Sequence, residues 1–274
     1  MSKISFDKIT SDDLISLVNL FGPFEEKFNE LRVLFHNHPD RFAIEGSLKP
    51  TWYKLYELPF KDHLVQVIVL TDQVEEVKKL AAQENPNQAT IKYSQQLLEN
   101  FDNGDEQFDE EDRPFLQFVF GLSASLYFSY KSLLIYGFYL NELIAIAGTD
   151  RKNGDKAIFN AIKIDPTVMA CQNVANRVSQ AIIENDTKFL KKLRNSLLGK
   201  LTKREDKTYQ KQRLVLQVLH ELAVPNLNQE ELYQLFVEEM DIVTKDRDGD
   251  IGDVANNLRQ FAYHFLKGKS VSQK

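Results

Sequence analysis

The chain has 274 residues, of which 43% are hydrophobic and 27% are charged. That balance is ordinary for a soluble globular protein and excludes a chain that is disordered throughout. A single cysteine, Cys171, excludes an intramolecular disulfide and a zinc site built from thiolates, so we expect a protein of a reducing compartment. The first residues, MSKISFDKITSDD, hold no apolar stretch behind the lysine, which indicates no secretory signal and favours the cytoplasm.

The net charge of −6 is distributed unevenly along the chain. Residues 188–213 hold ten basic residues against Glu205 and Asp206, a local surplus of +8, while the rest of the chain sums to −14. We call this segment the basic belt. A cationic segment on an acidic body attracts anionic partners, so we expect the belt to be a contact surface. Its candidate contact residues are Lys188, Lys191, Lys192, Arg194, Lys200, Lys203 and Arg204.

Residues 11–36 predict two amphipathic helices, with Gly22 and Pro23 at their junction. We expect the aromatic residues of the second helix, Phe24 among them, to lie in the core. The β-prone run at 64–70 continues at helical spacing and therefore predicts a helix. A further helix at 88–101 precedes an acidic linker near 102–113, which holds six carboxylates between Asp105 and Asp112.

A short string after the first helices suggests a metal site. His36 and His38-Pro39, followed by Ser47, resemble part of the zinc signature of the MPN metalloprotease family. In that signature two histidines and an aspartate three residues after the serine bind the metal, whereas this chain has Pro50 at that position. The resemblance implies a metal-dependent hydrolase using His36, His38 and an acidic residue from elsewhere. The departure at Pro50 favours the other interpretation, a polar loop that ends the helix.

The most apolar stretch runs from Phe115 to Ala147 and holds only two charges, Lys131 and Glu142. A membrane-spanning helix needs ~20 consecutive apolar residues, and Lys131 interrupts this stretch in the middle. We therefore expect no membrane insertion, but two buried helices at about 114–131 and 132–147. The other helices of the body would pack around them.

The segment that follows carries clear helix-start signals. Asp165 and Pro166 predict an N-cap and a first helical residue. The apolar stripe behind them includes Cys171 and Ile182, which predicts a buried thiol without a catalytic role. The next helix carries the first lysines of the basic belt on its outer face.

Residues 208–274 have the spacing of a three-helix unit, so we divide the chain into a helical body at 1–203 and this C-terminal unit. Three helices with a polar outer face on the last one resemble a helix-turn-helix unit, which implies a DNA-binding regulator as an alternative function. The candidate contact residues on that face are Asn256, Arg259, Gln260, Tyr263 and Lys267.

The loop before that helix resembles the first half of an EF-hand, with Asp246, Asp248 and Asp250. Ile251 and Asn257 stand where the calcium loop requires glycine and glutamate, so we expect no calcium site. No phosphate-binding loop or nucleophile motif occurs, and we expect no cofactor. The sequence thus predicts an all-α protein that acts through contacts with a protein partner or, alternatively, with nucleic acid.

Overall fold

The computed structural model describes residues 4–37, 52–103, 113–198, 209–243 and 251–272. These residues are helical almost throughout, and their strands amount to one short antiparallel pair, β1 (Ser5–Phe6) and β2 (Ile9–Thr10). The prediction of an all-α protein is therefore confirmed. By its internal contacts the chain forms two compact units: unit 1 holds residues 1–31, 76–106 and 209–274, and unit 2 holds residues 32–75 and 107–208.

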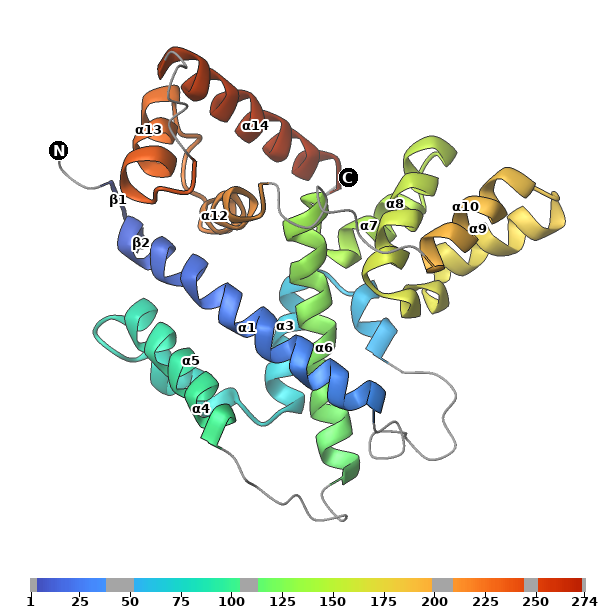
Figure 1. Ribbon diagram of the computed structural model, residues 1–274, viewed down its shortest axis with the longest axis horizontal. Helices are drawn as coiled ribbons and strands as arrows, with labels where there is room; N and C mark the ends of the chain where they lie inside the picture. Colours follow the sequence, from blue (N-terminus) through green and yellow to red (C-terminus); the bar gives the residue numbers. More distant parts are fainter. Residues whose placement is uncertain (1–3, 38–51, 104–112, 199–208, 244–250, 273–274) are drawn as a thin grey trace. The chain divides into compact units, whose positions relative to one another are not determined.

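Unit 2 is built around one continuous apolar core. Its buried residues come from η1 and from the consecutive elements α6 to α10, and α7 packs most extensively against α8. Figure 1 shows α9 and α10 beside α8, joined to each other by a short turn. The elements of unit 2 are η1 (Trp52–Glu57), α3 (Phe60–Leu70), α6 (Arg113–Tyr136), α7 (Leu140–Ala147), α8 (Arg151–Ile164), η3 (Pro166–Ala170), α9 (Gln172–Ile183) and α10 (Thr187–Leu198).

The apolar stretch forms two helices, α6 and α7, but the break lies later than the predicted junction after Lys131. Gly137 adopts φ 82°, a left-handed conformation that glycine enters without steric cost, and the turn at 137–139 separates the helices. Within the described residues, Phe118–Tyr136 alone is long and apolar enough to cross a membrane. In the structure 56% of this apolar segment is buried against other parts of the protein, as is usual for a helix of a protein core.

Unit 1 gathers segments from both ends of the chain. The N-terminal strands precede α1 (Ser11–Asn37), of which residues 32–37 are grouped with unit 2. The backbone N–H of Ile4 donates to the Glu239 carboxylate at 2.8 Å. The first two residues of helix α4 (Val74–Ala81) are grouped with unit 2, and its other residues are grouped with unit 1. The other elements of unit 1 are α5 (Pro86–Asn103), α12 (Gln210–Glu221), α13 (Gln229–Tyr233), the π-helical turn η4 (Gln234–Glu239) and α14 (Ile251–Ser272).

The N-terminal segment forms one helix, α1, where the sequence predicted two. Pro23 lies inside it, and although proline removes one hydrogen bond of the helix, the helix continues beyond it. Leu14, Val18 and Phe28 lie on one face and are all buried, so the apolar contacts extend across the proline. Phe24 is 49% exposed, which corrects its prediction as a core residue.

The division into units is not the linear one predicted from the sequence. Residues 1–31 and 76–106 group with 209–274, whereas the predicted boundary separates 1–203 from 208–274. Residues 104–112, which hold most of the predicted acidic linker, lie outside the described residues. Whether 208–274 folds on its own therefore stays a prediction.

Candidate anion-binding groove

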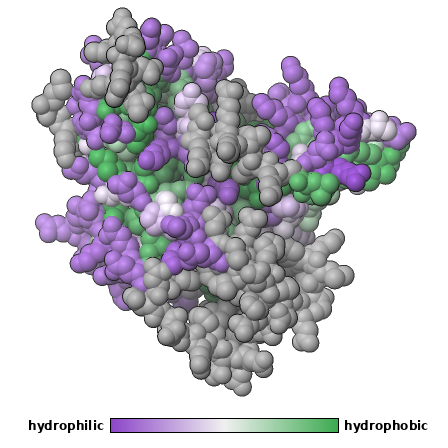
Figure 2. Space-filling model, viewed as in Figure 1, coloured by the Kyte–Doolittle hydropathy of each residue, from purple (hydrophilic) through white to green (hydrophobic). Residues whose placement is uncertain are grey.

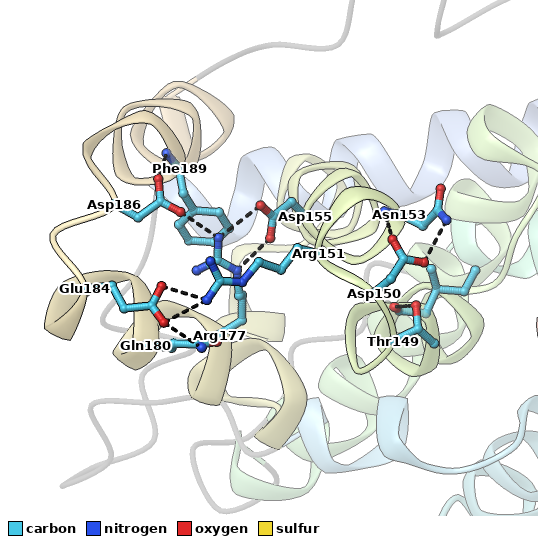
Figure 3. Close-up of polar contacts among 11 residues, drawn as sticks. Thr149, Asp150, Arg151, Asn153, Asp155, Arg177, Gln180, Glu184, Asp186 and Phe189 are labelled. Atoms are coloured by element: carbon cyan, nitrogen blue, oxygen red, sulfur yellow. Dashed lines mark hydrogen bonds and ion pairs between the residues drawn. The ribbon is translucent and has the colours of Figure 1, made fainter.

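A buried arginine connects the three helices α8, α9 and α10. Arg177, on α9, is 8% exposed and forms ion pairs with Asp155 of α8 at 2.7 Å and with Asp186 at 2.8 Å. Asp186 also accepts a hydrogen bond from the backbone N–H of Phe189, at the start of α10. Figure 3 shows the guanidinium between the two carboxylates. The arginine thus joins the three helices through two carboxylates.

The ionisation of this cluster follows from its hydrogen bonds. The hydrogen bond that Arg177 donates lowers the pKa of the Asp186 carboxyl, and the N–H of Phe189 lowers it further. The bonds from Arg177 to Asp155, and less strongly to Asp186, raise the pKa of the guanidinium despite the opposing effect of its burial. Arg177 and Asp186 therefore stay charged at neutral pH, and both carboxylates are already paired with the guanidinium.

Aromatic rings pack beside the ion pairs. The Phe159 and Phe189 rings lie with centroids 5.2 Å apart, and the Arg177 guanidinium lies 4.0 Å from the centroid of Phe189. The Lys192 ammonium is 6.0 Å from the centroid of Phe159, at the outer limit of a cation–π contact. The two rings pack α8 against α10 and form the apolar part of the lining of a groove.

That groove, of about 500 Å³, is lined mainly by positive charge. We call it the basic groove. Two carboxylates, Asp155 and Asp186, also line it, and both are bonded to Arg177. In Figure 2 the surface over α8 and α10 is mostly hydrophilic. The five cations that line the basic groove are Arg151, Lys152 and Lys156 of α8, and Lys188 and Lys192 of α10.

One of these cations has a further partner on the surface. Arg151 donates to both oxygens of Glu184 at 2.7 Å, and Gln180 donates to the same carboxylate. The pair is exposed, with 59% of the arginine side chain and 38% of the glutamate side chain accessible. An exposed pair of this kind is weak, so Glu184 neutralises the groove only in part.

The structure separates the predicted belt residues into two groups. Lys188 and Lys192 line the basic groove, whereas Lys191 and Arg194 are exposed on α10 and do not line it. Lys200, Lys203 and Arg204 lie outside the described residues. The sequence analysis missed Arg151, Lys152 and Lys156, although the string RKNGDK at 151–156 is a local basic cluster that could have indicated them.

The second predicted contact face, on α14, belongs to unit 1. Arg259, Tyr263 and Lys267 line a separate pocket between α12 and α14. Asn256 and Gln260 do not line it, and Asn256 accepts a hydrogen bond from Arg259 at 3.1 Å. Three of the five predicted residues therefore line one pocket, and the other two are not part of its lining.

A buried histidine–serine pair in unit 2 has no catalytic geometry. His63 Nε2 lies 2.8 Å from Ser125 Oγ, and that hydroxyl donates to the carbonyl of Leu122 at 2.6 Å. Because the serine uses its proton on the backbone, the histidine donates to the serine and does not activate it. Burial lowers the pKa of His63 to about 4, so the imidazole is neutral. The pair connects α3 to α6.

Cys171 and Asp165, which the sequence predicts as a buried thiol and as an N-cap, also stabilise the fold. Cys171 is fully buried, and burial raises the pKa of its thiol to about 12, which keeps it unreactive. Asp165 caps η3 as predicted, accepting from the backbone N–H of Thr167 at 2.9 Å. Its other oxygen accepts from Tyr56 at 2.7 Å and from Trp52 at 3.1 Å. These bonds join η1 to η3.

The metal hypothesis is not tested by this structure. The side chain of His36, and residues 38–51 with His38, Ser47 and Pro50, lie outside what the structure describes. The same holds for residues 244–250 of the loop that resembles an EF-hand. Among the described side chains, no group of three histidine, cysteine or carboxylate residues is placed to hold a metal ion.

Comparisons of the chain with protein-family models, with curated proteins and with solved structures find no match.

Proposed function

We propose that this chain is a non-enzymatic, cytoplasmic binding protein, and that the basic groove holds an acidic segment of a partner protein. One observation carries the proposal: five cations from two helices converge on one groove, whose own two carboxylates are bonded to a buried arginine. Because Arg177 pairs with these carboxylates, they compete only weakly for Lys152, Lys156, Lys188 and Lys192. The surplus positive charge is available to carboxylates from outside.

The size of the basic groove favours a short acidic segment over an extended nucleic acid. Its volume of about 500 Å³ suits a few side chains of a peptide. A duplex carries one charge per ~1.7 Å over its whole length, and the chain outside the basic belt sums to −14. That acidic remainder repels a long polyanion more than it repels a short segment. Nucleic acid is the alternative that the experiment distinguishes.

The experiment compares two pairs of cations on the same helix. Lys188→Gln with Lys192→Gln removes two charges from the groove, while Lys191→Gln with Arg194→Gln removes two exposed charges of α10 outside it. The probe is a fluorescent ten-residue peptide with six glutamates, titrated by anisotropy at about 50 and 200 mM salt. We expect saturable binding that weakens with salt, and a loss of about tenfold in the groove variant, since each contact contributes up to ~1 kcal/mol.

The control variant should lose less than about threefold. Equal losses in the two variants would show that net charge alone attracts the peptide, and would overturn the assignment to the basic groove. A fluorescent single-stranded oligonucleotide and a duplex of ~20 base pairs provide the second comparison. If either binds more tightly than the peptide and responds to the groove variant, the partner is nucleic acid and the proposed protein partner is wrong.

A further inference from the structure

A second hollow lies in unit 1, where α12, α13 and α14 meet. It has a volume of about 510 Å³ and is lined by residues of α12 and α14, by the segment 224–227 and by Leu232 of α13. Four apolar side chains form its floor, and all are at least nine-tenths buried: Leu216, Leu219, Leu232 and Ala262. We call it the α12/α14 groove.

The rim of the α12/α14 groove is cationic. Its two cations, Arg259 and Lys267, are exposed on the wall that α14 forms. The Tyr263 ring, 59% exposed, lies between the two cations along α14, with the Lys267 ammonium 5.7 Å from its centroid. No carboxylate is among the residues that line the groove. An apolar floor with a cationic rim is complementary to a ligand that is apolar on one side and acidic at its edges.

We propose that the α12/α14 groove binds an acidic amphipathic helix of a partner protein. Arg259 and Lys267 are eight residues apart on α14, which is about 12 Å along a helix axis at ~1.5 Å per residue. A partner helix that lies along α14 and carries acidic residues seven or eight positions apart would place one beside each cation. Apolar residues three and four positions after the first acidic residue would then face the floor and Tyr263.

The same geometry disfavours direct reading of DNA by this face. Base recognition by a helix needs a row of polar side chains that project into the major groove. Here Arg259, Tyr263 and Lys267 border an apolar hollow, and Asn256 accepts a hydrogen bond from Arg259. An apolar segment fills that hollow better than a sugar–phosphate backbone does. The proposal does not depend on the basic groove of unit 2, so each can fail alone.

The test uses the full-length protein and a fluorescein-labelled 18-residue helical peptide with glutamates at i and i+7 and leucines at i+3 and i+4. A scrambled peptide of the same composition removes the apolar face but keeps the charge. We expect saturable anisotropy for the first peptide and at least tenfold weaker binding for the scrambled one. Arg259→Gln with Lys267→Gln should weaken binding about tenfold, and Tyr263→Ala about fivefold, since both changes are at exposed positions that leave the fold intact.

The matched control removes two exposed lysines of unit 1 that do not line the groove, by Lys92→Gln with Lys211→Gln. This variant should bind within about twofold of the unchanged protein. Equal binding of the scrambled peptide, or equal losses in the rim and control variants, would refute the proposal. Binding of dodecanoate that the rim variant abolishes, with no binding of the helical peptide, would likewise refute it and assign the groove to a long-chain carboxylate.

Discussion

His63 shows how one buried residue makes stability depend on pH. Its side chain is 1% exposed, and burial lowers its pKa from 6.5 to about 4. The unfolded chain therefore takes up a proton near pH 6.5, whereas the folded chain does so only near pH 4. The free energy of unfolding is therefore not reduced by His63 above pH 6.5, and it decreases as the pH falls from 6.5 towards 4.

We expect the free energy of unfolding to fall by about 2 kcal/mol between pH 7 and pH 5 because of His63, at ~1.4 kcal/mol per pH unit below its unfolded pKa. His63→Gln should remove that part of the pH dependence, even if it lowers stability at both pH values. Urea unfolding followed by circular dichroism at the two pH values gives the difference. An unchanged difference in the variant would show that the pKa of His63 is the same in the folded and unfolded chains, and would contradict this prediction.

At the scale of elements, the buried Arg177 joins α8 to α9 and to the start of α10. Arg177→Met would leave Asp155 and Asp186 without their cation. The side chains of these two residues are each about a quarter exposed. Breaking a fully buried pair costs ~3–5 kcal/mol, so for these partly exposed carboxylates we expect a loss of about 2–4 kcal/mol. Arg177→Lys keeps the charge but loses the planar fork, and should cost less. Urea unfolding measures each loss.

Arg151 supplies the control for that prediction, because it also connects α8 to the end of α9, through Glu184. That pair is exposed, so Arg151→Gln should cost less than about 0.5 kcal/mol. Similar losses for the Arg151 and Arg177 variants would mean that the buried position of Arg177 adds nothing to stability. Comparing the two losses in stability therefore distinguishes the effect of burying an ion pair from the effect of having any ion pair between α8 and α9.

Sequence reasoning predicts the helices themselves better than their ends. The helical class, the N-cap at Asp165 and the burial of Cys171 follow from spacing and capping chemistry, and the structure contains them. The break that was predicted at Pro23 is absent, because buried contacts on both sides continue the helix. Ile182, predicted within an apolar stripe, is 63% exposed at the end of α9, where the stripe leaves the core.

Two of the five cations of the basic groove were predicted from the sequence, and the other three were not. Lys188 and Lys192 belong to a charge cluster visible in the sequence, but only packing brings Arg151, Lys152 and Lys156 to the same groove. The neutralisation of Asp155 and Asp186 is also invisible in the sequence, because Arg177 is 22 and 9 residues away from them. Local charge can be read along a chain, whereas the pairing of that charge depends on contacts between helices.

At the scale of the whole molecule, the two units differ in how their chain segments are assembled. Unit 2 consists of two segments, with α6 to α10 consecutive in one of them, whereas unit 1 joins three segments from distant parts of the sequence. In unit 1 the segment at 209–274 is grouped with 1–31 and 76–106, and Ile4 bonds to Glu239 across 235 residues. The C-terminal helices therefore have partners that a cut at 203–208 would remove.

This grouping predicts the behaviour of the isolated fragment 208–274. A domain of that length buries only about 60% of the surface of its unfolded chain and is marginally stable even when complete. Without residues 1–31 and 76–106, we expect the fragment to retain helical circular dichroism but to unfold on heating without a cooperative transition, while the full chain unfolds cooperatively. Binding of a fluorescent dye to exposed apolar surface should rise in the fragment. A sharp transition within a few degrees of the full chain would contradict this expectation, and would instead establish the boundary at 203–208 that the sequence predicts.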